Sequence, residues 1–155
     1  MSVADRLADL GLELPSVPHP AGAYIPAKAH GELVFTAGQL PLVSGVLPAT
    51  GKVGEADGLI APADAYQYAR LCALNAIAAA ADVAGGVERL TGVLKVTGFV
   101  SSVPEFTGQP GVINGASELL GEVFGDAGRH ARSAVGVPVL PLDSPVEVEV
   151  VFTVA

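Results

Sequence analysis

The chain has 155 residues with 16 acidic and 8 basic side chains, which gives a formal net charge of −8 at pH 7. The length fits a single domain over residues 1–155, and the acidic balance, without a cluster of lysines or arginines, argues against a nucleic-acid partner. Hydrophobic residues make up 50% of the chain and charged residues only 15%, so we expect part of the apolar surface to be buried between subunits.

Residues 1–20 are predicted to form an extension in front of the main fold. Ser2 can cap a short helix that ends near Gly11, and the prolines within residues 15–20 favour an extended segment. The first residues lack the basic region and the apolar core of a secretory signal. We therefore expect a cytoplasmic protein.

Residues 23–29 and 32–38 are predicted to form a β-hairpin, because both are rich in strand-forming side chains. His30 and Gly31 between them suit a tight turn. Residues 45–61 then form a long loop, since glycine and proline interrupt every periodic pattern in this stretch. A loop of this length is typical of a segment beside a functional site.

Two helices are predicted after the long loop. Residues 62–83 begin with a proline and stop before Gly85, and residues 110–124 carry apolar side chains at helical spacing. The apolar run at residues 71–81 is too short to cross a bilayer, which needs about 20 apolar residues, so no membrane partner is expected. Cys72, the single cysteine, cannot form a disulfide within the chain and is expected to be a small buried hydrophobe.

Three further strands complete the predicted fold. Residues 90–102 form the first, and two strands close the chain, one containing Arg132 and one over residues 146–152. The short link at residues 141–145 makes the last two strands antiparallel neighbours. The order β-β-α-β-α-β-β predicts an α+β fold with one sheet backed by two helices. The side chains expected on one side of the first of these strands are Leu94, Val96 and Val100.

Arg132 is the first candidate functional residue. It alternates with valines and shares one strand face with Ala134 and Gly136, so a guanidinium lies among small side chains. A guanidinium on an interior strand can grip a carboxylate with two parallel hydrogen bonds. A structural ion pair with Glu147 or Glu149 across a subunit interface explains the pattern equally well. The sheet face without helices is expected to carry Arg132, Ala134, Gly136 and Glu147, and to be covered by another copy of the chain.

Glu147 and Glu149 alternate with valines, so both carboxylates lie on the same face of the last strand. One of them can orient a water molecule or relay a proton near Arg132, whereas a solvated strand face is the default interpretation for Glu149. His19, His30 and His130 lack the spacing of metal ligands. We expect them on turns or at the surface, and we expect no metal site.

The segments most informative about function are Ala131-Arg132-Ser133 with Leu140-Pro141, and Val146-Glu147-Val148-Glu149. They are supported by Ala21-Gly22-Ala23-Tyr24, by residues 33–41 and by Val112-Ile113-Asn114. Taken together, these segments resemble the RidA/YjgF family of reactive-intermediate deaminases, also called the endoribonuclease L-PSP family. The resemblance implies a chorismate-mutase-like α+β fold, a homotrimer with clefts between subunits, and no cofactor.

The resemblance also implies an activity. In the family, the arginine that matches Arg132 binds the carboxylate of a small 2-imino acid, and the glutamate that matches Glu147 positions water or moves a proton. Water attacks the imine carbon, and the products are a 2-keto acid and ammonia. The partner implied is therefore a small carboxylate-bearing imine or keto acid. The residues expected to line or frame the cleft are Tyr24, Ala37, Gly38, Asn114 and Ala134.

Two positions depart from the family pattern. Ala37 stands where the family often has serine, and Ala134 stands where many deaminases have cysteine, so two polar contacts are missing and the pocket is expected to be wider or drier. A non-catalytic trimer that binds a small metabolite carboxylate is therefore the alternative to a deaminase. A ribonuclease, which the older family label implies, is the least favoured interpretation because the chain is acidic and has no basic groove.

Overall fold

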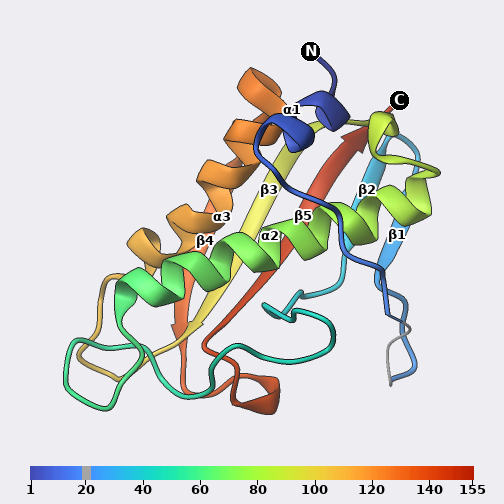
Figure 1. The fold of residues 1–155 in the computed structure, drawn as a ribbon. Coiled ribbons are helices and arrows are strands. Elements are labelled where there is room, and N and C mark those ends of the chain that lie inside the picture. Colours follow the sequence, from blue (N-terminus) through green and yellow to red (C-terminus); the bar gives the residue numbers. More distant parts are fainter. Residues whose placement is uncertain (19–21) are drawn as a thin grey trace.

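The computed structural model describes residues 1–18 and 22–155, and it contains one mixed five-stranded sheet with two long helices on one face (Figure 1). His19, Pro20 and Ala21 lie outside the described residues, and with them the first position of the motif that ends at Tyr24. The elements in chain order are α1 (Val3–Asp9), β1 (Ala27–His30), β2 (Leu33–Thr36), α2 (Pro62–Ala84), η1 (Val87–Arg89), β3 (Leu90–Ser101), α3 (Gln109–Phe124), η2 (Gly125–Gly128), β4 (Ala131–Val137), η3 (Pro141–Asp143) and β5 (Val146–Val154). The predicted α+β class and the order β-β-α-β-α-β-β are confirmed.

The strands lie in the order β1-β2-β5-β3-β4, with β4 parallel to β3 and the other neighbouring pairs antiparallel. The prediction that the last two strands are neighbours is wrong, because β3 lies between them. Their link passes the end of β3 (Figure 1), where the Ser101 amide donates to the Pro145 carbonyl at 2.9 Å. Neighbouring strands are about 5 Å apart, so even a short link can reach across one intervening strand.

One irregularity in β3 changes which side chains face the core. The register with β5 shifts between Val93 and Lys95, and Leu94 is 50% exposed, whereas Val96 and Val100 are fully buried. The expected grouping is therefore wrong for Leu94 and correct for the two valines. A β-bulge adds one residue to a strand and turns the following side chains by one position. The apolar alternation of the sequence does not mark where the bulge lies.

The amino-terminal helix is packed against the main fold. The Ser2 hydroxyl accepts from the Asp5 amide at 3.0 Å and the Asp5 carboxylate accepts from the Ser2 amide at 2.9 Å, a capping box that starts α1 as predicted. Leu7 is buried in the core, and the Ala4 amide donates to Glu88 at 3.2 Å. The segment predicted as an extension thus contributes to the core.

The hairpin is shorter than predicted. Its turn includes Gly31, whose φ of 58° suits glycine, but β1 begins only at Ala27. Tyr24 therefore precedes the strand, and its side chain is 60% exposed. The prediction that the first strand begins at residue 23 and includes Tyr24 is therefore wrong, since Pro26 lies between Tyr24 and the strand and cannot donate to a ladder.

Helix α2 covers the centre of the sheet with small side chains. Its alanines include Ala69, Ala73 and Ala76, all fully buried, and Cys72 is buried among them as predicted. Gly85 ends the helix with a φ of 88°, in the left-handed conformation that favours glycine. Within the described residues, no helix combines the length and the apolar character needed to span a membrane.

Helices α2 and α3 approach each other closely at Gly115. A Cβ atom at this position would overlap the carbonyl oxygen of Tyr66, so the two helices fit only because the residue has no side chain. Polar pairs flank this contact, since the Tyr66 hydroxyl donates to Glu118 and Arg70 Nη2 lies 2.9 Å from Glu122 Oε2.

We expect Gly115→Ala to lower the free energy of unfolding by about 1–3 kcal/mol, because the backbone oxygen of Tyr66 can move only together with α2. Gly111→Ala is the matched control: it lies on the same helix, a Cβ atom there would have no neighbouring atom within 4 Å, and alanine favours helix. Chemical denaturation of both variants at one protein concentration measures the difference. Equal stability of the two variants would contradict the close contact.

Candidate functional site

The predicted site residues lie on both faces of the sheet. Arg132 pairs with Val96 and Gly136 with Val100, and both valines are buried under the helices, so this face of β4 points toward the helix layer. Ala134 lies on the same face. The expectation that these three residues lie on the uncovered face is therefore wrong. The alternation of side chains in the sequence separates the two faces of a strand, but it does not reveal which face the helices cover.

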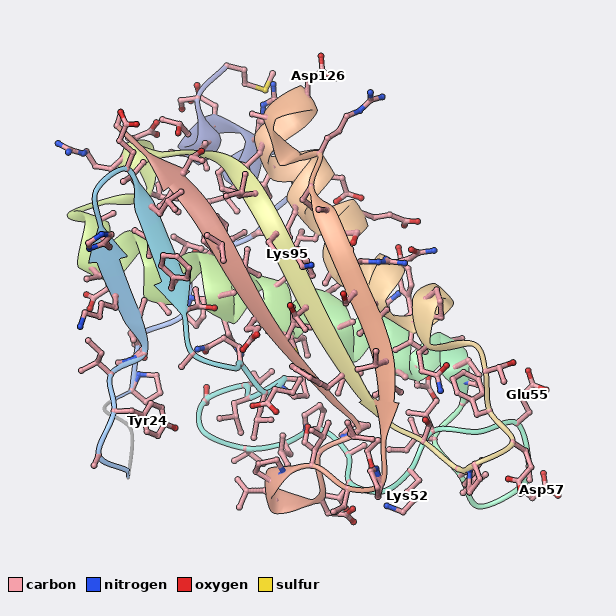
Figure 2. The ribbon with its side chains drawn as sticks, turned by 180° about the vertical axis from the view of Figure 1, so that it is seen from behind. Tyr24, Lys52, Glu55, Asp57, Lys95 and Asp126 are labelled. Carbon is pink, nitrogen blue, oxygen red and sulfur yellow. The ribbon has the colours of Figure 1, made fainter. Side chains whose placement is uncertain are left out.

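Glu147 and Glu149 do lie on the uncovered face, as predicted. Glu147 pairs with Phe99 and Glu149 with Thr97, which alternate with the buried valines of β3. Figure 2 views the molecule from this side, with the helices behind the sheet and Lys95 pointing toward the viewer. Within one chain, Arg132 and Glu147 are thus separated by the sheet and form no ion pair.

Arg132 is held by the first half of α3. Its Nη1 donates to Asn114 Oδ1 at 2.8 Å and to Ser117 Oγ at 3.2 Å, and its Nη2 donates to the Pro110 carbonyl at 3.3 Å. The three acceptors are spaced by four and three residues, which places them on one face of the helix. Asn114 was expected to frame the cleft that Arg132 serves, and this contact is consistent with that expectation.

The guanidinium retains two free donors. Five N–H groups are present on an arginine, and three of them are used by α3. Across residues 1–18 and 22–155 no further acceptor bonds to Arg132, so the Nε–H and one Nη2–H have no partner. Two N–H groups in this arrangement can bind both oxygens of a carboxylate. Arg132 is therefore both fixed in place and able to bind an anion.

Sequence reasoning missed two members of this cluster, Ser117 and His130. Ser117 Oγ lies between Arg132 Nη1 and His130 Nε2, which it contacts at 2.9 Å, and His130 Nδ1 lies 2.6 Å from the Gly128 carbonyl. His130 lies between η2 and β4 and is half-buried, and the expectation of a turn or surface histidine did not include its two hydrogen bonds. The available signals were the helical spacing of Ser117 from Asn114 and the position of His130 two residues before Arg132.

Glu147 packs against Gly38, where the chain leaves β2. A Cβ atom on Gly38 would overlap the Glu147 carboxylate, and the bridge between Gln39 and Val148 holds this segment on β5. Burial raises the pKa of Glu147, and the negative charge of Glu149 raises it further. Of the two carboxylates, Glu147 is the half-buried one and Glu149 is exposed. This identifies Glu147 as the better candidate for a role in a cleft.

Glu147→Gln is expected to make the protein more stable at neutral pH. The raised pKa means that the folded protein holds this proton to higher pH than the unfolded chain, so wild-type stability falls as pH rises through the window above the ordinary glutamate value. Glutamine is uncharged and avoids this loss. The free energies of unfolding of wild type and Glu147→Gln, measured by denaturation from about pH 4 to about pH 7, should therefore diverge as pH rises. Glu13→Gln, at an exposed site, controls for removing one charge, and parallel curves for wild type and Glu147→Gln would refute the expectation.

The other predicted site residues, Ala37 and Tyr24, lie in different places. Ala37 adjoins Gly38, and its amide donates to the Pro26 carbonyl at 2.7 Å. Tyr24 lies before the start of β1 and away from the centre of the sheet (Figure 2). It forms no hydrogen bond with Arg132 or Glu147. In the part of the chain that the structure describes, no three His, Cys, Asp or Glu side chains gather as metal ligands.

The fold and the site define a class: α+β proteins with a single mixed sheet, helices on one face, and an edge-strand arginine anchored to a helix. A family profile described as "YjgF/chorismate mutase-like, putative endoribonuclease" matches residues 4–154, so the chain belongs to this family. The resemblance read from the sequence and the chorismate-mutase-like fold are both confirmed.

Individual relatives agree with this assignment. Protein TCP17 of Trypanosoma cruzi is 39% identical over 148 residues, which cover 95% of this chain and 91% of that protein. The structure of a candidate endoribonuclease from Shewanella oneidensis has a TM-score of 0.92 at 34% identity, covering 99% of this chain and all of the other. TdcF of Escherichia coli with bound serine has a TM-score of 0.65 at 26% identity, covering 90% and 94%.

Proposed function

We propose that this protein is an enamine/imine deaminase that hydrolyses small 2-imino acids to 2-keto acids and ammonia. The observation that carries the proposal is the free pair of donors on an arginine whose other N–H groups are bonded to α3. Such a group binds a carboxylate with two hydrogen bonds and sets the orientation of the adjoining imine carbon.

The chemistry requires little beyond orientation. The protonated imine carbon is electrophilic, and water adds to it to give a carbinolamine, which expels ammonia and leaves the ketone oxygen. Glu147 can accept the proton that the attacking water loses, and its raised pKa suits proton exchange nearer to neutral pH. The reaction is a hydrolysis and, as written, uses no cofactor.

A cleft that combines both residues has to form between chains. Arg132 faces the helix layer at the edge strand, and Glu147 lies on the opposite face of the sheet. The uncovered face also exposes large apolar side chains, with Phe35 at 45% and Val135 at 44%. A second copy that covered this face could bring its own Arg132 around the sheet edge to the Glu147 of its neighbour. Three such contacts close a homotrimer.

The test is to generate 2-aminoacrylate with a serine dehydratase and to follow the release of keto acid and ammonia. Wild-type protein should accelerate release above the uncatalysed rate, and Arg132→Ala should abolish the acceleration while unfolding at a similar temperature. Full activity in Arg132→Ala would end the proposal. The bound serine of the related TdcF is consistent with a site for small molecules that carry a carboxylate.

A non-catalytic trimer that binds a metabolite carboxylate is the second candidate. It is favoured by Ala37 and Ala134, which carry only methyl groups at the positions where the family often has the hydroxyl of serine and the thiol of cysteine. Thermal shifts with pyruvate, together with no turnover of any imine tested, would support it over the deaminase. Turnover that depends on Arg132 would exclude it.

A further inference from the structure

A chain of hydrogen bonds runs inward from Arg132. Arg132 Nη1 is 3.2 Å from Ser117 Oγ, Ser117 Oγ is 2.9 Å from His130 Nε2, and His130 Nδ1 is 2.6 Å from the Gly128 carbonyl. Ser117 comes from α3, His130 immediately precedes β4, and Gly128 ends η2. Three segments of the chain therefore meet behind a single guanidinium.

The direction of each hydrogen bond follows from the chemistry of the groups. A carbonyl oxygen only accepts, so His130 Nδ1 carries the hydrogen that Gly128 receives. In the neutral imidazole the other nitrogen is then an acceptor, and the Ser117 hydroxyl donates to it. This leaves the lone pairs of Ser117 Oγ for Arg132 Nη1. Ser117 therefore accepts from Arg132 and donates to His130, and His130 accepts from Ser117 and donates to Gly128, so the three hydrogen bonds are mutually compatible.

The inner end of this chain is rigid. Gly128 is buried, and a Cβ atom on it would overlap the Leu120 carbonyl of α3, so its backbone lies directly against the helix. Ser117 is half-buried on the same helix. The two hydrogen-bond partners of His130 are therefore fixed by α3: Ser117 belongs to the helix, and the Gly128 backbone lies directly against it. Arg132, by contrast, has a long side chain and lies on an edge strand.

We propose that Ser117 and His130 are positioning residues that fix the rotation of the Arg132 guanidinium, so that its Nε–H and free Nη2–H face the carboxylate of the substrate. An arginine side chain loses considerable rotamer freedom when it binds. Holding the guanidinium in its binding orientation beforehand removes part of that cost and strengthens carboxylate binding. The inference extends the proposed function, on which its substrate rests, but the rotation itself can be measured without any substrate.

Paired substitutions separate this role from a structural one. His130→Gln keeps an acceptor near the position of Nε2 and loses the donor to Gly128, whereas His130→Asn keeps a donor near Nδ1 and loses the acceptor for Ser117. Ser117→Ala removes the bridging hydroxyl, and Ser117→Thr retains it. The proposal requires that Ser117→Thr behaves like wild type, that His130→Asn and Ser117→Ala behave alike, and that His130→Gln, which keeps the acceptor for Ser117, is affected less than His130→Asn.

Two measurements on the intact protein test this. In the first, NMR of the ligand-free protein follows the Nη signals of Arg132, which are resolved only when rotation about the Nε–Cζ bond is slow. We expect resolved signals in wild type and Ser117→Thr, averaged signals in His130→Asn and Ser117→Ala, and less averaging in His130→Gln than in His130→Asn. In the second, imine hydrolysis should show KM raised roughly 5- to 30-fold in the latter two variants, with a smaller change in kcat.

The outcomes distinguish this inference from the proposed function. Unchanged Nη signals in Ser117→Ala would overturn the inference whether or not the protein is a deaminase. Normal behaviour of His130→Asn together with impaired His130→Gln would also overturn it, because His130 would then act only through Gly128. Wild-type protein that turns over no imine and binds no pyruvate would refute the proposed function, while the NMR comparison would still decide how Arg132 is held.

Discussion

Mixing Arg132→Ala chains with Glu147→Gln chains is expected to restore up to about one quarter of the wild-type deaminase activity, although each variant alone should retain a few per cent at most. The reason is that the two side chains lie on opposite faces of the sheet in one chain. In the proposed homotrimer, a complete site takes Arg132 from one chain and Glu147 from its neighbour. Each site in a randomly mixed trimer has a chance of about one half for each intact partner, hence about one quarter for both.

The experiment denatures the two variants together in equal amounts, refolds them and assays the whole mixture, with different tags to verify that trimers containing both chains have formed. Refolded single variants serve as controls and should stay inactive. If mixed trimers form and remain inactive, the site is not shared in this way. If one of the single variants is fully active, that residue is not part of the reaction.

Much of the fold could be predicted because local signals coincide with the element boundaries. Helix α2 starts at Pro62 and stops at Gly85, and the capping box at Ser2 starts α1. Apolar spacing located α3 and the apolar alternation located β3. These features depend on residues close in sequence, so a single chain is sufficient to reveal them.

The arrangement of the strands depends on distant contacts, and there the sequence was insufficient. The alternation around Arg132 correctly separated two strand faces, but nothing local states which face meets the helices. The link between β4 and β5 was equally compatible with direct pairing and with a strand between them. The bulge at Leu94 is set by pairing with β5 rather than by the residues of β3 itself.

The candidate site shows the same division. The strand pattern made Arg132 a candidate, and the family resemblance added Asn114 and Gly38; in the structure Asn114 contacts Arg132 and Gly38 lies against Glu147. Ser117 and His130 are common residue types without a motif, and their relation appears only when α3 and the start of β4 come together. Side chains that act through another residue are therefore the part of a site that sequence patterns reveal least.

Arg132→Lys is expected to impair imine hydrolysis almost as severely as Arg132→Ala. A lysine keeps the positive charge but has one nitrogen, which cannot contact Asn114 and Ser117 and also bind both oxygens of a carboxylate. Loss of about two charge-assisted hydrogen bonds costs about 2–4 kcal/mol, which corresponds to a decrease of roughly 30- to 1,000-fold in kcat/KM. Most of the effect should appear in KM, because the carboxylate is bound both before and during the reaction.

Steady-state kinetics on 2-aminoacrylate measure this decrease, with Arg89→Lys as the matched control. Arg89 is exposed next to the start of β3, and its side chain makes no hydrogen bond among the described residues. The control should therefore keep wild-type kinetics. An Arg132→Lys variant that also kept wild-type KM would show that a positive charge alone is sufficient. The hypothesis that Arg132 binds the carboxylate with two hydrogen bonds would then be wrong. A hydrogen bond from the lysine to Asn114 cannot rescue the variant, because the single ammonium group would have to bond to both α3 and the substrate from one position.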